Sequence, residues 1–121
     1  MNSNFFEVES THIDKIQLIV LNGYLDAHTA PKLEVEIQNS IDKGNKFILL
    51  DFENLDYISS AGLGVFMAFI EELRENGGDI KMTAMKPKVY SVFDLLGFPI
   101  LFDITQTRQE AIANFDTIIN K

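Results

Sequence analysis

The sequence of 121 residues contains no cysteine and carries a low share of basic residues. Without cysteine the chain can form neither disulfides nor a thiolate nucleophile, which fits a reducing compartment. Ten Lys and Arg residues stand against 18 Asp and Glu residues, which gives a net charge of -8. Nucleic acids and anionic membranes both attract basic surfaces. The composition therefore predicts that neither nucleic acid nor membrane is a partner.

Long hydrophobic runs are absent as well. The longest apolar run covers residues 61–70, far fewer than the roughly 20 residues that a membrane-spanning helix needs. Residues 1–10 are polar and acidic and do not resemble a signal peptide. The hydrophobic share of 46% is typical of a folded globular chain. We therefore expect a cytoplasmic protein with one domain over residues 1–121.

Strand-like and helix-like segments alternate along the chain. Short apolar runs predict strands at 5–8, 15–21, 47–52, 79–84 and 100–104. Apolar residues at helical spacing predict helices that begin near Thr29, Ser59, Pro87 and Thr107, with Thr29 as the first cap. Residues 22–26 are expected to form a turn or a break in the strand. This alternation predicts an α/β fold with a mixed, mostly parallel sheet of about five strands and about four helices.

Several catalytic signatures are missing. There is no P-loop and no glycine-rich dinucleotide fingerprint. A serine hydrolase would need Gly-x-Ser-x-Gly, but Ile58 lies two residues before Ser60, and the only histidines, His12 and His28, precede the first helix. No cluster of metal ligands is evident. The sequence thus predicts no enzyme, no cofactor and no metal site.

A phosphoacceptor receiver domain is one alternative, because it has a similar length and alternation. Asp51 and the pair Lys86-Pro87 match part of its pattern. The first strand, however, ends without the acidic pair that would hold magnesium. Aspartyl phosphorylation lacks electrophilic support without that metal. This alternative would require magnesium-dependent labelling of Asp51.

The most informative segment is Ile58-Ser59-Ser60-Ala61-Gly62-Leu63-Gly64. A serine before an apolar helical run is ordinarily a helix N-cap. Two glycines in the first turns, each costing about 1 kcal/mol relative to alanine, are unusual for a plain cap. A serine at the positive end of a helix is also well placed to carry a phosphate. We therefore expect a modifiable serine beside backbone that a partner can approach closely.

This segment, together with Asp51 and the run Gly-Tyr-Leu-Asp-Ala-His-Thr-Ala at residues 23–30, resembles the STAS domain family. Within that family the resemblance is to the anti-sigma factor antagonists. They typically show Gly-x-Leu-Asp-x-x-Thr-Ala after an early strand and Asp-Ser-Ser/Thr-Gly-Leu-Gly at the start of a later helix. Both motifs occur here in the same order, and the resemblance covers essentially the whole chain.

The resemblance implies that Ser60, two residues before Gly-Leu-Gly, is the phosphoacceptor. Ser59 stands where the family usually has Asp, so Ser59 stays open as an alternative acceptor. Asp26 matches a family residue near the partner-binding face, although a solvent-exposed turn aspartate would explain it equally well. The implied partner-binding residues are Asp26, Ser59, Ser60, Ala61, Gly62, Leu63 and Gly64. The apolar run that follows is expected to be mostly core, with one edge left for the partner.

The resemblance further implies a partner switch that acts by binding. The unmodified form would bind an anti-sigma factor that is also a serine kinase, and this binding would free a sigma factor. Phosphorylation by that kinase would break the complex, and a PP2C-type phosphatase would restore it. The alternative is a STAS scaffold that is never phosphorylated and serves a transporter or sensory complex. Ser59, at the position where the family usually has Asp, favours this alternative.

Overall fold

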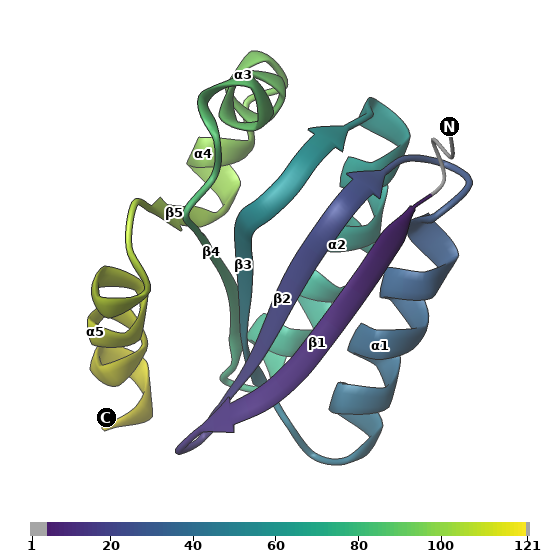
Figure 1. Ribbon diagram of the computed structural model, residues 1–121. Coiled ribbons are helices and arrows are strands. Elements are labelled where there is room, and N and C mark those ends of the chain that lie inside the picture. Colours follow the sequence, from purple (N-terminus) through teal and green to yellow (C-terminus); the bar gives the residue numbers. More distant parts are fainter. Residues whose placement is uncertain (1–4, 121) are drawn as a thin grey trace.

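Five strands form one sheet in the order β1-β2-β3-β4-β5 in the computed structural model, which describes residues 5–120 (Figure 1). The strands are β1 Phe6–Ile13, β2 Ile16–Leu25, β3 Phe47–Ile58, β4 Asp79–Thr83 and β5 Asp103–Thr105. The helices are α1 Ala30–Asp42, α2 Ser60–Glu75, α3 Pro87–Leu95, α4 Phe98–Leu101 and α5 Arg108–Ile119. None of these helices is long and apolar enough to cross a membrane.

The sheet is mixed, as predicted. β1 and β2 form an antiparallel hairpin, whereas β2, β3, β4 and β5 run parallel to their neighbours. A parallel neighbour needs a crossover connection, and the helices α1, α2 and α3–α4 supply these crossovers. The carboxyl ends of β2 and β3 therefore point in the same direction, toward the top of Figure 1.

Helices cover both faces of the sheet. The larger hydrophobic cluster packs α1, α2, α3 and α4 against one face, and phenylalanines of β3, α2 and α3 are in mutual contact there. The smaller cluster packs Ala111 and Phe115 of α5 on the other face. Figure 1 shows α5 on the opposite side of the sheet from α1 and α2. Coverage on both faces explains the nearly continuous apolar pattern of β2 and of the first half of β3.

Some predicted boundaries were wrong. Residues 22–25 were predicted to break the strand, but they continue β2. Two register shifts in the pairing with β3 and the positive φ of 100° at Gly23 let the strand remain paired through this irregular segment. β1 and β3 extend to Ile13 and Ile58, beyond their predicted ends. The predicted strand at 100–104 is instead the end of α4 followed by a three-residue β5. Residues 5–120 thus form five helices, and the additional one is short.

The short helix α4 has a local cause. Gly97 ends α3 with a left-handed φ of 78°, which glycine adopts without strain. Pro99 then fits the first turn of a new helix, where its missing N–H is harmless. The apolar residues around it resemble a strand in the sequence pattern, but half of them are exposed in the structure.

An ion pair between the half-exposed Arg108 and the buried Asp51 links α5 to β3. Asp51 is 1% exposed, and its carboxylate accepts hydrogen bonds from Arg108 Nε and, at 2.8 Å, from the backbone N–H of Glu53. A buried carboxylate is tolerated only with such partners. A sealed and paired Asp51 does not favour the receiver-domain alternative, which needs an accessible aspartate.

We predict that Arg108→Leu lowers the free energy of unfolding by about 2 kcal/mol, because it leaves a buried carboxylate short of a partner. Urea unfolding followed by circular dichroism measures this loss. Gln109→Leu, at the neighbouring exposed position of α5, is the matched control and is expected to leave stability nearly unchanged. Equal stability of the two variants would contradict the structural role of the ion pair.

Candidate functional site

The two serines lie where β3 meets α2. β3 continues to Ile58 and α2 begins at Ser60, so a single residue, Ser59, separates strand from helix. The backbone N–H of Ser59 donates to the carbonyl oxygen of Leu25 at 2.9 Å. This bond ties the junction to the end of β2. The loop after β2 and the first turn of α2 therefore meet at one edge of the sheet.

The structure gives the two serines different environments. Ser59 is the N-cap of α2, and its Oγ accepts a hydrogen bond from the N–H of Gly62 at 3.3 Å. Ser60 is the first helical residue and is exposed. Its hydroxyl makes no hydrogen bond to any residue between 5 and 120 within the usual distance. The capping role therefore falls to Ser59, and the hydroxyl of Ser60 faces solvent.

The amino end of α2 is electrostatically favourable for an anion. The first amides of a helix have no partner within it, and they give this end a partial positive charge. No acidic side chain occupies the first turn of α2. A phosphate on the Ser60 hydroxyl would lie beside these amides. Such a group would be stabilised there without unfolding the helix.

The two glycines of the motif differ in their steric surroundings. A Cβ at Gly62 would lie 2.9 Å from the carbonyl oxygen of Leu25 and 3.0 Å from its Cγ. Gly62 is therefore required by the close approach of α2 to the end of β2. A Cβ at Gly64 would meet nothing within 4 Å, and Gly64 is exposed. Packing within the chain does not explain this second glycine.

The helix α2 divides into a buried and an exposed face. The buried face carries Gly62, Leu63, Val65, Phe66, Phe69, Ile70 and Leu73. The exposed residues near its amino end are small or flexible: Ala61, Gly64, Met67 and Ala68. The apolar run is thus mostly core with one exposed edge. Leu63 is only 1% exposed, so any contribution to a partner surface is indirect.

Asp26 is held in the turn that precedes α1. Its Oδ1 accepts hydrogen bonds from the N–H groups of His28 at 2.9 Å and Thr29 at 3.0 Å. Thr29 is the N-cap residue, as predicted, but its hydroxyl bonds to the carbonyl oxygen of Tyr24 at 2.8 Å and does not cap the helix. The Asp26 side chain therefore holds the turn just before α1 and does not cap the helix itself. Asp26 follows Leu25 directly, and so it lies at the same edge of the sheet as Ser59.

The structure adds neighbours that sequence reasoning missed. The rings of Tyr24 and Tyr57 pack against each other in a tilted arrangement with centroids 5.9 Å apart, and they are 36% and 48% exposed. Tyr24 lies within the first motif and Tyr57 directly precedes the second, each two residues before Asp26 or Ser59, and these positions were the available signal. Asp56 pairs with Lys86 at the start of α3. The hydrogen bond and charge of Lys86 hold the pKa of Asp56 below its usual value.

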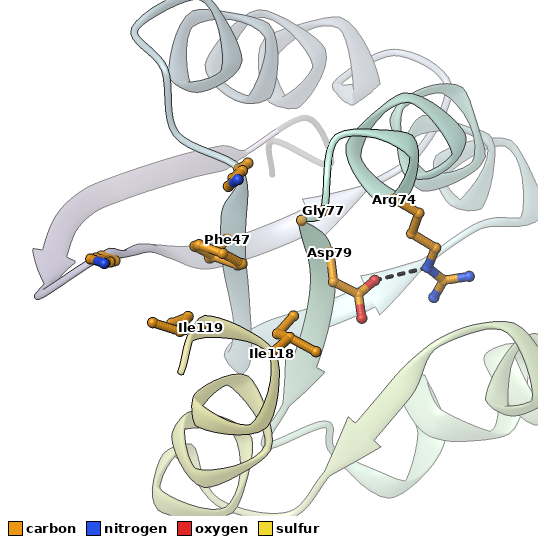
Figure 2. A pocket seen from close by; sticks show the side chains of 9 residues that line it. Phe47, Arg74, Gly77, Asp79, Ile118 and Ile119 are labelled. Atoms are coloured by element: carbon orange, nitrogen blue, oxygen red, sulfur yellow. Dashed lines mark hydrogen bonds and ion pairs between the residues drawn. The ribbon is translucent and has the colours of Figure 1, made fainter. Parts of the chain in front are cut away.

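A surface hollow of about 710 Å³ lies at the opposite edge of the sheet (Figure 2). It is lined by Lys15, Lys46, Phe47, Arg74, Gly77, Gly78, Asp79, Ile118 and Ile119. Figure 2 shows Arg74 bonded to Asp79, at 3.0 Å, and Lys46 donates to the carbonyl oxygen of Asn76 at 3.2 Å. Because two of its three cations are engaged and helix carboxyl ends gather here, the hollow does not favour an anionic ligand.

Comparison with known proteins gives consistent results. A family model described as the STAS domain matches residues 7–111. BtrV of Bordetella bronchiseptica, provisionally named an anti-sigma factor antagonist, is 36% identical over 107 residues, 88% of this chain and 92% of BtrV. The anti-sigma-B factor antagonist of Staphylococcus aureus is 27% identical over 106 residues, 88% of this chain and 95% of that protein.

Solved structures of the anti-sigma factor antagonist SpoIIAA are also similar. The unphosphorylated form matches with a TM-score of 0.75 and 26% identity, over 97% of this chain and 98% of SpoIIAA. The phosphorylated form of SpoIIAA, from Bacillus, matches with a TM-score of 0.67 and 26% identity, over 91% of this chain and 98% of that chain. The fold described above is therefore the fold of these proteins.

We predict opposite changes in stability for alanine substitutions at the two glycines of α2. Gly62→Ala forces a methyl group against Leu25, and we expect a net loss of about 1 kcal/mol after the gain in helix propensity is subtracted. Gly64→Ala has open space, and we expect a gain of about 0.5–1 kcal/mol. Chemical denaturation of the two variants measures both. The same sign of change in both variants would contradict the steric difference.

Proposed function

The chain belongs to the STAS domain family and, within it, to the anti-sigma factor antagonists, and from this premise we propose a partner switch at Ser60. The unmodified protein binds an anti-sigma factor that is also a serine kinase and so frees a sigma factor. That kinase phosphorylates Ser60, which ends the complex, and a PP2C-type phosphatase restores the binding form. The protein acts by binding rather than by catalysis. The observation that carries the proposal is the exposed Ser60 hydroxyl at the first position of α2.

The geometry supports Ser60 over Ser59 as the acceptor. A phosphate on Ser59 would replace the hydroxyl that accepts the hydrogen bond from Gly62, and it would start from a partly buried position. A phosphate on Ser60 disturbs no hydrogen bond recorded for the described residues. Its neighbours on the exposed face are Ala61 and Gly64, which leave room for a kinase active site.

The effect of phosphorylation on binding follows from charge. A phosphoserine adds roughly -1.5 to -2 charges at neutral pH. On a surface that becomes dry on docking, this charge loses its hydration and faces any partner carboxylate. A penalty of about 3 kcal/mol weakens binding by more than a hundredfold. The fold itself need not change, which agrees with the similarity of this chain to both forms of SpoIIAA.

A second candidate is a STAS scaffold that is never phosphorylated and serves a transporter or sensory complex. Ser59, in place of the Asp that the family usually has, favours it because a charge that a kinase could recognise is missing. Affinity purification from the native host separates the candidates. Recovery of a transporter or sensor complex without an anti-sigma factor kinase would support the scaffold.

We predict that Ser60→Ala abolishes phosphorylation by the cognate kinase, whereas Ser59→Ala remains a substrate. Ser59→Ala removes the N-cap and is expected to cost about 1 kcal/mol of stability, while Ser60→Ala is nearly neutral. Intact-mass and peptide mass spectrometry after incubation with kinase and ATP measure the modification. Full phosphate uptake by Ser60→Ala would show that Ser60 is not the acceptor.

Gly64 gives a test of docking that is independent of phosphorylation. We predict that Gly64→Leu stabilises the free protein, because leucine is a better helix former, and that it weakens binding of the unphosphorylated protein to the kinase at least tenfold by blocking close approach. Glu72→Leu, an exposed position on the same helix, is the control. Isothermal calorimetry measures both affinities. Unchanged binding of Gly64→Leu would place the partner elsewhere.

A further inference from the structure

Two tyrosines lie on the surface beside the loop serines. Tyr24 and Tyr57 are partners in the parallel pairing of β2 and β3, and each strand ends one residue later. Their rings pack against each other, yet they stay 36% and 48% exposed. Neither phenol hydroxyl makes a hydrogen bond to a residue between 5 and 120 within the usual distance. Both side chains are therefore available to a partner.

The two rings lie on the face of the sheet that carries α5. Leu25 and Ile58, the next residues along the strands, are buried in the cluster with α1 and α2. Neighbouring residues of a strand point to opposite faces, which puts the tyrosines on the other side. α5 packs only on the first halves of β2 and β3, and Figure 1 shows it beside the lower part of the sheet. In the described chain, the face around the tyrosines is therefore left open.

Acidic side chains border the tyrosines on this open face. Glu7 and Glu53 each follow a phenylalanine of the larger hydrophobic cluster, so they point to the face of the tyrosines. Both are exposed, and neither forms an ion pair with a residue between 5 and 120. Beside Tyr57, Asp56 already holds Lys86. We call Glu7, Tyr24, Glu53 and Tyr57 the tyrosine face, and its charge suits a cationic partner surface.

The tyrosine face lies within reach of a partner that docks at Ser60. Tyr57 precedes Ser60 by three residues, so their Cα atoms are at most about 11 Å apart. Tyr24 lies on the neighbouring strand, about 5 Å from Tyr57. A standard interface covers about 800 Å² of each partner, which corresponds to a disc of roughly 16 Å radius. An interface of this size centred on Ser60 therefore extends over the tyrosines.

Tyrosines also supply what the start of α2 lacks. Ser60, Ala61 and Gly64 are small, and small residues contribute fit but little binding energy. Tyrosine, in contrast, is enriched among the few residues that contribute most of the energy of an interface. Its ring face attracts cations, and arginine most often fills this role because its planar guanidinium stacks on the ring.

We propose that Tyr24 and Tyr57 anchor the anti-sigma factor kinase whose docking is switched at Ser60, and that the kinase places an arginine against their rings. This inference rests on the proposed function and adds the partner's second contact. Glu7 and Glu53 attract the same positively charged surface of the kinase. The tyrosine face supplies affinity, and Ser60 supplies the change in affinity on phosphorylation.

Substitutions that separate the aromatic ring from apolar bulk test the anchor. Tyr57→Leu keeps an apolar side chain without a ring face, whereas Tyr57→Phe keeps the ring and loses the hydroxyl. The same two changes are made at Tyr24. Tyr90→Leu is the matched control, because Tyr90 is 38% exposed and lies on α3 beside a hollow near β5. Binding to the purified anti-sigma factor kinase of the same organism is measured by calorimetry, and melting curves verify that each variant is folded.

We expect Tyr24→Leu and Tyr57→Leu each to raise Kd at least about fivefold, whereas the phenylalanine variants stay within about twofold. Tyr90→Leu should bind like the unsubstituted protein. Glu7→Gln combined with Glu53→Gln should make Kd less sensitive to salt, because fewer charges face the kinase. Unchanged binding by both folded leucine variants would overturn the anchor and leave the proposed function standing. Equal losses in the phenylalanine and leucine variants would overturn the arginine contact.

Three further results would also decide the question. If light scattering shows a dimer of the free protein that Tyr57→Leu abolishes, and kinase binding is unaffected, the tyrosine face is a contact between copies and the proposal is wrong. If the unsubstituted protein does not bind the kinase, the proposed function fails and the anchor fails with it. If Ser60→Glu binds as tightly as the unsubstituted protein while the leucine variants bind weakly, the switch fails and the anchor stands.

Discussion

The close approach of α2 to the end of β2 is the constraint on which the candidate site depends. The backbone of Ser59 is bonded to Leu25, and Gly62 has no room for a side chain against the same residue. This contact fixes where the helix begins, and it commits the Ser59 hydroxyl to the cap. It also turns the next hydroxyl, that of Ser60, outward. A helix that began one residue later would place Ser60, and not Ser59, at the cap.

Asp26 and the β2–α1 turn depend on the same contact. Asp26 accepts hydrogen bonds from the backbone N–H groups of the two residues just before α1, and it directly follows Leu25. Both motifs of the sequence therefore converge on one backbone carbonyl group, although they lie far apart along the chain. The parallel pairing of β2 and β3 brings their carboxyl ends to the same edge of the sheet. The hollow at the other edge plays no part in this arrangement.

The sequence was sufficient to predict the fold class and the position of the motif, because both depend on local patterns. Apolar runs marked β2, β3 and β4, and Thr29 and Pro87 marked helix starts. Tertiary contacts decided the rest. The irregular end of β2 is held by pairing with β3, and the apolar run near Ile100 forms a helix because Gly97 and Pro99 allow it. The unequal roles of Ser59 and Ser60, and of Gly62 and Gly64, required knowing what surrounds each residue.

The central claim is that the cap at Ser59 and the switch at Ser60 are separate. Nuclear magnetic resonance of the protein phosphorylated to one phosphate per chain tests it most directly. The account predicts that the Ser60 amide shifts as phosphoserine amides do, while the Gly62 amide stays protected from hydrogen exchange by its bond to Ser59. A phosphoserine signal at residue 59, with loss of protection at Gly62, would contradict the account.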